Sequence, residues 1–227
     1  SVLNWLVGDV QKKLDAYDIT GAARAIERFV VDDLSQWYVR RSRERLQEDE
    51  KAMEVFRSVL KTMAKLIAPF APFISEAAWQ ELGNGDSVHL EHFPVATEET
   101  NAALMSVMIQ VRKEVGTGLF MRAEKKVKIR QPLNAYAVLL SDWKMFENLD
   151  TETQEELKNI IADELNVKNI LVNEEGGFDW HITKELELEG GVRELIRKIQ
   201  DARKKAGLKP GDSVISIGCW PTFFMAL

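Results

Sequence analysis

Apolar residues recur every three or four positions along the first half of the chain, which is the spacing of one face of an amphipathic α-helix. The pattern predicts an antiparallel helical bundle with short connections. Pro69 and Pro72 divide two of its helices, because proline removes a backbone donor and interrupts the helical ladder. The predicted helices cover residues 2–16, 20–46, 56–67, 74–82 and 101–116.

The spacing changes in the second half, where short stretches alternate apolar and polar residues as strands do. Helical spacing returns in two segments, so strands and helices are mixed there. We therefore expect a mainly α protein, with a helical bundle over residues 1–118 and a small α+β junction module over 119–227. The predicted strands are 135–140, 167–172, 180–188 and 214–217, and the predicted helices are 151–165 and 191–206.

A basic segment introduces the second module. Between Arg122 and Arg130, apolar residues at 127 and 129 stand between Lys126, Lys128 and Arg130. This alternation predicts an extended arm with one basic face, which Pro132 ends. Gly116 and Gly118 are expected to break the preceding helix.

The longest predicted helix, residues 20–46, changes character at Trp37, where its apolar stripe gives way to arginine. At about 100° per residue, Arg40 and Arg41 lie within about 80° of Trp37, whereas Arg43 points away from it. Arginine grips phosphate oxygens in pairs and stacks on bases, so one interpretation is an RNA-facing helix end. The other is a solvated terminus whose arginines pair with nearby carboxylates, which the helix alone favours because charge runs are usually solvated.

Overall composition is that of an ordinary globular protein, with 45% hydrophobic and 29% charged residues. The net charge of −6 conceals a segregation. Residues 101–135 carry seven basic and two acidic side chains and 190–227 carry seven and three, while 136–189 carry four and fourteen. Because a binding field depends on local charge, a phosphate-binding face is compatible with the acidic total.

The single cysteine, Cys219, excludes an internal disulfide and a multi-cysteine zinc site, and we expect a cytoplasmic setting. No apolar run reaches the roughly 18 residues of a membrane span, so no membrane association is expected. The chain opens with Ser1 and Val2 inside a predicted helix, which indicates a fragment of a longer protein.

Residue sets for catalysis are missing from the sequence. There is no P-loop or dinucleotide-binding glycine motif, no Gly-x-Ser-x-Gly, and no supported Cys/His nucleophile. His89, Glu91 and His92 lie close together in the sequence, and Glu91 with either histidine could form part of a metal site. No third ligand of suitable type is evident nearby, so we interpret these residues as surface residues. No catalytic or metal-binding residue is predicted.

Four blocks in order resemble the anticodon-binding region of the isoleucyl-tRNA synthetases, which are class I enzymes. The blocks are residues 37–43 (WYVRRSR), 66–76 (LIAPFAPFISE), 122–133 and 186–208. The valyl and leucyl enzymes share the Trp-Tyr and Ala-Pro-Phe elements but carry an acidic residue where this chain has Arg40 and Arg41. They are the alternative within the class, and a protein-interaction scaffold that binds no RNA is the alternative outside it.

The resemblance implies a monomeric tRNA-binding module that holds the anticodon arm while a separate catalytic domain works on the acceptor end. The family's ATP-binding signatures are absent, so the chain should need no cofactor and should not charge tRNA alone; ATP and magnesium would serve the catalytic domain. Glu44 and the acidic residues 48–50 depart from the family's more basic pattern. The expected tRNA contacts are Trp37, Arg40, Arg41 and Arg43, with Arg122, Lys126, Lys128, Arg130, Arg197 and Lys204 as secondary contacts.

Overall fold

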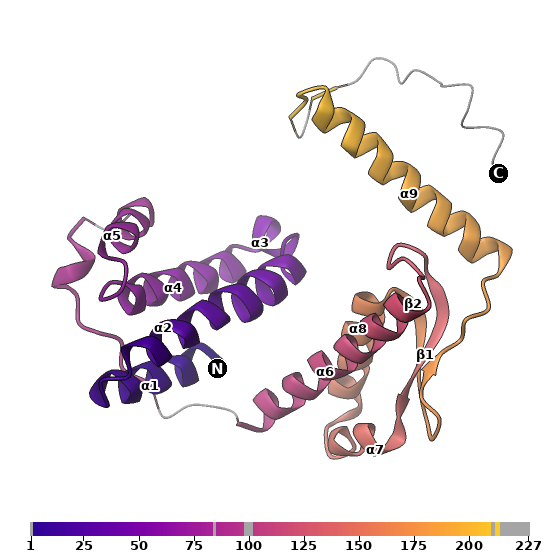
Figure 1. Cartoon of the computed structure of the whole chain (residues 1–227), viewed down its shortest axis with the longest axis horizontal. Coiled ribbons are helices and arrows are strands. Elements are labelled where there is room, and N and C mark those ends of the chain that lie inside the picture. The colour runs from indigo at the N-terminus through magenta and orange to yellow at the C-terminus, as the bar shows by residue number, and fades with distance from the viewer. Residues whose placement is uncertain (1, 84, 98–101, 210–211, 214–227) are drawn as a thin grey trace. The chain divides into compact units, whose positions relative to one another are not determined.

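The computed structural model describes residues 2–83, 85–97, 102–209 and 212–213. It divides into two compact units, Ser1–Met105 and Ser106–Leu227 (Figure 1). The first unit is helical and the second combines helices with a three-stranded sheet, which confirms the predicted mainly α fold with a small α+β module. The boundary falls before residue 106 rather than at 118, because the last long helix of the predicted bundle packs on the sheet of the second unit.

The helices of the first unit follow the predicted pattern closely. Asp18 and Asp49 cap two of them, since their carboxylates accept hydrogen bonds from the backbone N–H of Gly21 (2.8 Å) and Lys51 (2.9 Å). Pro72 is the first residue of its helix, where its missing N–H costs nothing. The elements are α1 (Val2–Asp15), α2 (Ile19–Arg28), the π-helix η1 (Phe29–Val39), α3 (Arg45–Glu48), α4 (Glu50–Ile67), α5 (Pro72–Glu81) and the 3₁₀-helix η2 (Val88–Leu90).

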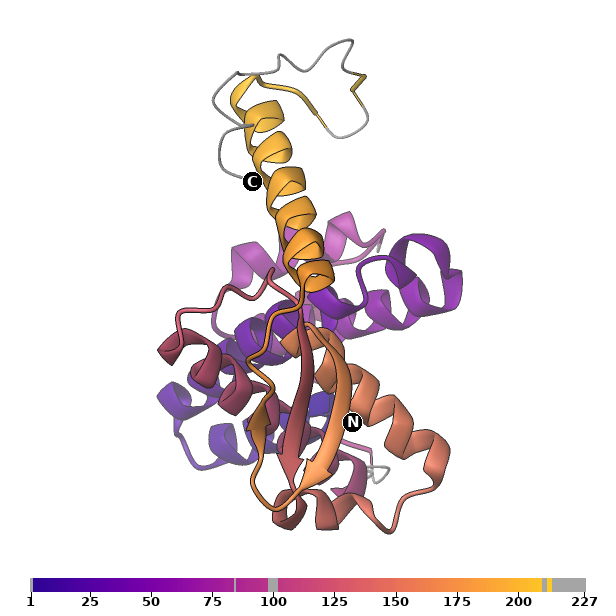
Figure 2. The same cartoon turned by 90° about the vertical axis from the view of Figure 1, so that its right-hand side faces the viewer.

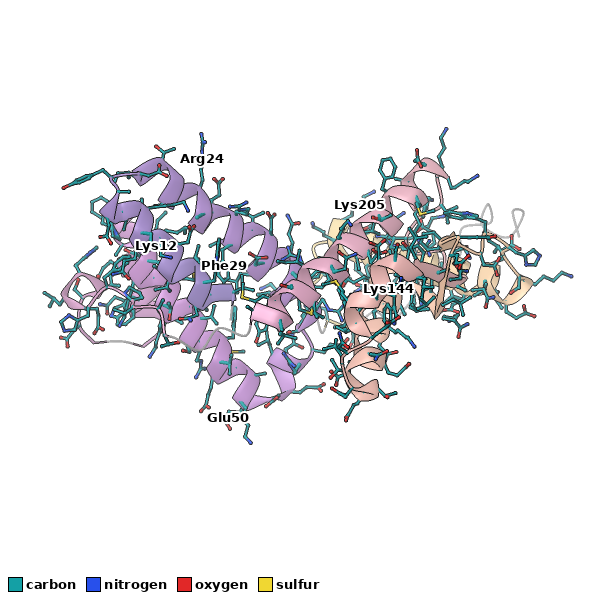
Figure 3. The ribbon with its side chains drawn as sticks, turned by 90° about the horizontal axis from the view of Figure 1, so that it is seen from below. Lys12, Arg24, Phe29, Glu50, Lys144 and Lys205 are labelled. Atoms are coloured by element: carbon teal, nitrogen blue, oxygen red, sulfur yellow. The ribbon has the colours of Figure 1, made fainter. Side chains whose placement is uncertain are left out.

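The core of the first unit lies between α1, α2, η1 and α4, which run side by side in Figure 1. Leu6, Val10 and Leu66 are almost completely removed from solvent there. In Figure 3, Phe29 lies toward this interior and Arg24 on the outer surface of the same continuous helix. Each fully buried aliphatic or aromatic side chain contributes about 1.5–3 kcal/mol, so this apolar face holds the bundle together.

The wider turn of η1 changes which residues face the core. In a π-helix each N–H bonds five residues back, so residues four and five apart share a face. Leu34 is buried, and Tyr38 and Val39 pack against the same core. The α-helical spacing of the sequence placed Trp37 on this stripe. In the structure Trp37 is half-buried outside the core cluster.

The second unit is built on a sheet with the strand order β2-β1-β3 (Figure 2). β1 pairs parallel with β2, from Leu133 opposite Val167, and antiparallel with the short β3. The connection from β1 to β2 passes through α8, as parallel pairing requires a crossover. The elements are α6 (Ala102–Glu124), β1 (Leu133–Leu139), α7 (Leu140–Trp143), the 3₁₀-helix η3 (Lys144–Phe146), α8 (Thr151–Leu165), β2 (Val167–Asn173), β3 (Gly177–Phe178) and α9 (Lys184–Lys205).

Two glycines that were expected to break α6 lie within it. Gly118 faces α8 so closely that an added Cβ would stand 2.6 Å from a methyl carbon of Leu165. A Cβ added at Gly116 would have no neighbouring atom within 4 Å. Gly118 therefore serves helix packing, and α6 continues to Glu124 because the packing outweighs the low helix propensity of glycine.

Two other predicted elements are wrong. Residues 180–188 form no strand, because Thr183 starts α9 by accepting a hydrogen bond from the N–H of Leu186 (3.4 Å), and Glu185 and Glu187 suit the first turn of a helix. Residues 122–130 form no extended arm. Their first three residues end α6 and the rest form turns. The predicted strand at 214–217 lies outside the described residues.

Candidate nucleic-acid interface

The end of the helix formed by α2 and η1 gathers the first group of predicted contacts. The guanidinium of Arg41 lies over the ring of Trp37, 5.5 Å from its centroid. Arg40 is exposed, and its Nε donates to the carbonyl of Gln36 (2.8 Å). These are contacts between residues four apart, so the helix itself sets the positions of the two arginines.

Helical backbone ends at Arg41, earlier than the predicted residue 46. A turn follows at Ser42. This residue is buried, and its backbone N–H donates to the carbonyl of Tyr38 (2.9 Å). The ring of Tyr38 lies 6.2 Å from that of Phe56 in α4 and anchors the helix end to the bundle. Arg43 lies exposed on this turn. The structure thus places Trp37, Arg40 and Arg41 at the end of the helix and Arg43 on the turn that follows it.

Arg122 contradicts the prediction that its side chain meets RNA. It is only 2% exposed, and its guanidinium donates to the carbonyls of Lys128 (3.2 Å), Gln131 (2.9 Å) and Asn166 (3.1 Å). It also lies 5.1 Å from the ring centroid of Phe178. Burial lowers the pKa of Arg122 to about 10, so the side chain stays charged at neutral pH. A group enclosed in this way cannot touch a phosphate.

The remaining basic residues of this segment lie on turns that follow α6. Lys126 adopts a left-handed conformation (φ 57°) and donates its N–H to the carbonyl of Ala123 (3.0 Å), while Val127 donates to that of Arg122 (2.9 Å). This pair of bonds is a Schellman motif, with lysine in place of the usual glycine. A second turn closes where the N–H of Gln131 bonds the carbonyl of Lys128 (3.0 Å). Lys126, Lys128 and Arg130 are all exposed.

The first half of α9 lies beside this second turn. Gln131 donates to the carbonyl of Leu186 (2.8 Å). The guanidinium of Arg197 pairs with Glu194 (2.7 Å) and Asp201 (2.5 Å). Its positive charge is therefore offset by two carboxylates before any phosphate could bind. Hydrogen bonding by Arg197 lowers the pKa of Glu194, and the charges of Lys128 and Arg130 lower it further. The positive charges of Lys128, Arg130 and Arg197 therefore all act on the carboxylate of Glu194, and Lys204 is exposed further along α9.

Sequence reasoning missed Arg193 as a member of this group. Its guanidinium hydrogen-bonds the side chains of Asn166 and Glu189, which ties α9 to the end of α8. The signal was present, because Arg193 and Arg197 are four residues apart and share one face of a helix. What the sequence did not show is that Arg193 meets Asn166, which lies 27 residues earlier in the chain.

Two carboxylates outside the basic groups, Glu91 and Glu114, have defined partners in the described part of the chain. Glu91 pairs with Lys65 (2.6 Å), and no three His, Cys, Asp or Glu side chains among the described residues could hold a metal ion. Glu114 is buried beside Tyr136, and burial raises its pKa. Within the described ranges, no helix combines the length and apolar composition needed to cross a bilayer.

Residues 1–137 match the family model described as the anticodon-binding domain of tRNA ligase. The match covers the bundle, the helix end at Trp37 and the turns after α6, and it reaches into β1. The chain belongs to this family.

Individual relatives of this anticodon-binding domain extend the similarity beyond residue 137, since they cover 88–94% of the chain. The chain is 37% identical over 213 residues to the isoleucine–tRNA ligase of Streptomyces coelicolor, covering 90% of this chain and 20% of that protein. It is 35% identical over 240 residues to that of Dehalococcoides mccartyi strain CBDB1, covering 94% and 24%. The isoleucine–tRNA ligase of Thermus thermophilus is 36% identical over 216 residues, covering 88% and 20%. The chain thus spans about a fifth to a quarter of these relatives.

Proposed function

We propose that this chain binds the anticodon arm of isoleucine tRNA and acts as part of an isoleucine–tRNA ligase. The family match and the relatives named isoleucine–tRNA ligase support this proposal. The single observation that carries the site is the helix end, where Arg41 stacks on Trp37 beside the exposed Arg40. Guanidinium groups would bind phosphates, and the aromatic ring would support stacking by an unstacked anticodon base.

Chemistry at the acceptor end of the tRNA belongs, in this proposal, to a separate catalytic domain, for which the greater length of the relatives leaves room. That domain would use ATP and magnesium. The present chain would supply affinity and orientation, because phosphate contacts fix register without carrying sequence information. Discrimination among isoleucine, valine and leucine tRNAs would come from contacts to base edges.

A gel-shift titration with isoleucine tRNA at two salt concentrations tests the proposal. The Arg40→Ala/Arg41→Ala variant should lose at least about 10-fold in affinity and reduce the salt slope by about 1.4 to 1.8, the value for two lost phosphate contacts. Arg24→Ala/Arg28→Ala is the matched control, since both arginines are exposed on the same continuous helix and the change in net charge is equal. Equal losses in both variants would indicate a field effect rather than a site.

Two results would reject the proposal. Binding that does not depend on salt would exclude phosphate contacts. Equal, weak affinity for isoleucine tRNA, other tRNAs and unrelated polyanions would instead favour a module that pairs with acidic protein surfaces.

A further inference from the structure

Among the described residues, Arg122 is the largest side chain that is almost fully buried, yet it holds exposed residues in place. Its guanidinium donates to the carbonyls of Lys128 and Gln131, the first and last residues of the turn that carries Ile129 and Arg130. Its own carbonyl accepts the N–H of Val127, which closes the preceding turn. One residue therefore binds both turns from inside.

A second tether reaches the same turn from α8. Asn166 ends that helix in a left-handed conformation (φ 50°), and its side-chain Nδ2 donates to the carbonyl of Ile129 (2.7 Å). The backbone carbonyl of Asn166 accepts from Arg122 (3.1 Å) and from the N–H of Leu133 (3.1 Å). Arg122 and Asn166 thus occupy three carbonyls of residues 128–131, while the side chains of Lys128 and Arg130 are exposed.

The requirement for arginine follows from the donor geometry. The three acceptors belong to residues 128, 131 and 166, and a guanidinium presents five N–H donors in a rigid plane. A lysine ammonium could replace part of this set but has no planar fork to span it. The stacking of Arg122 on Phe178 adds a further constraint on that plane.

We infer that Arg122 is a positioning residue that fixes the turn at 128–131 and so aims Lys128 and Arg130 at the RNA backbone. This inference rests on the proposed tRNA-binding function. Arg122 touches no RNA in it and acts through the backbone of the turn. Without the hydrogen bonds from Arg122 to the turn, Lys128 and Arg130 remain on the surface. They then occupy many conformations, and ordering them on binding costs entropy.

Binding measurements on four forms of the full chain test this role: unchanged protein, Arg122→Lys, Lys128→Gln/Arg130→Gln, and the triple variant. In the unchanged protein, Lys128→Gln/Arg130→Gln should lower affinity for isoleucine tRNA about 10-fold at 0.15 M salt and reduce the salt slope by about 1.4 to 1.8. Arg122→Lys should reduce affinity about 5-fold and the slope by about 1. In the Arg122→Lys background, the pair of substitutions should then cost only about 2-fold more.

Non-additivity and salt slope separate positioning from a general loss of structure, because a smaller folded fraction changes neither. Additive effects, or unchanged affinity and slope in a folded Arg122→Lys variant, overturn the inference while leaving the proposed function intact. If the unchanged protein shows no salt-dependent tRNA binding, the proposed function itself fails.

Asn166→Gly supplies a second variant should Arg122→Lys not fold. Glycine keeps the left-handed backbone and the carbonyl that Arg122 binds, and removes the two side-chain hydrogen bonds of Asn166, to the carbonyl of Ile129 and from Arg193. Asn166→Gly should reduce the salt slope, as Arg122→Lys does. Its loss of affinity should also be non-additive with that of Lys128→Gln/Arg130→Gln. An unchanged slope in this variant overturns the inference.

Discussion

Arg41 and Arg122 both place a guanidinium over an aromatic ring, at 5.5 Å from Trp37 and 5.1 Å from Phe178. Arg41 is half-buried and its ring partner is four residues away on the same helix. Arg122 is enclosed, and its ring partner belongs to a strand far along the chain. The similar stacking geometry therefore occurs in two environments, since Arg122 is enclosed and donates to three protein carbonyls, whereas Arg41 is half-buried at a helix end.

The largest expected difference between the two arginines is in stability. Arg122→Met should lower the free energy of unfolding by about 3 kcal/mol, because three part-buried carbonyls lose a charged donor. Arg41→Met should change it by less than about 0.5 kcal/mol, as expected for a surface substitution. Urea unfolding followed by circular dichroism measures both. Equal losses of stability in the two variants would contradict the assignment of a structural role to Arg122 and a surface role to Arg41.

Packing of α6 on α8 supports the hydrogen bonds from Arg122 to the turn, because α6 carries Arg122 and α8 ends at Asn166. Gly118→Ala should destabilise by about 2 kcal/mol, since the new methyl would overlap Leu165, which is fully buried. Gly116→Ala is the matched control and should stabilise by up to about 1 kcal/mol, because its surroundings are open and alanine is the better helix former. Thermal unfolding of the two variants should shift in opposite directions; a shared direction would contradict the packing role of Gly118.

A change of pH should alter the stability contributions of one glutamate in each unit in opposite directions. Burial raises the pKa of Glu114 in the second unit above 4.5, so its contribution to stability is present below pH 4.5 and is lost as pH rises through the folded value. Hydrogen bonds from Gln80 and Ser87 lower the pKa of Glu76 in the first unit, so its contribution is present above pH 4.5 and lost as pH falls.

Glu114→Gln should therefore stabilise the protein more at pH 7 than at pH 4, and Glu76→Gln should destabilise it at pH 7. Unfolding free energies at the two pH values give both numbers. A Glu114→Gln effect that does not change with pH would show that the carboxyl titrates alike in the folded and unfolded chain.

The smallest expected effect concerns Arg197. Glu194 and Asp201 already pair with it, so Arg197→Ala should change affinity for isoleucine tRNA by less than about 2-fold, well below the loss for Arg40 and Arg41. A fluorescence-anisotropy titration at low salt resolves this difference. A loss comparable to that of the helix end would show that RNA displaces the carboxylates.

Local signals in the chain predicted most elements correctly. Helical spacing located α1, α4, α5 and α8, a short apolar run located β1, and imperfect period-two alternation located β2, because the apolar residues of each element must be buried. The failures lie where two local codes compete. Residues 180–188 alternate like a strand, yet the cap at Thr183 and the acidic first turn decided for a helix.

The candidate site was predicted less completely. Residues 37–43 were found because the change from aromatic to arginine occurs within one helix. Arg122 was misassigned because it is basic like its neighbours Lys126 and Lys128. A pattern of residue types along the chain does not show which side chains the fold buries. Its acceptors come from residues up to 44 positions away.

By itself, the sequence determined the two classes of structure, the helix that turns basic after Trp37, and the resemblance to an anticodon-binding region, since all three depend on neighbours in the chain. Only the tertiary structure decided the roles of individual cations. The wider turn of η1 moved Trp37 off the core stripe, and the meeting of α6 with the end of α8 buried Arg122 while leaving Lys128 and Arg130 exposed. Burial is a property of what packs around a side chain, and that is settled by contacts between distant segments.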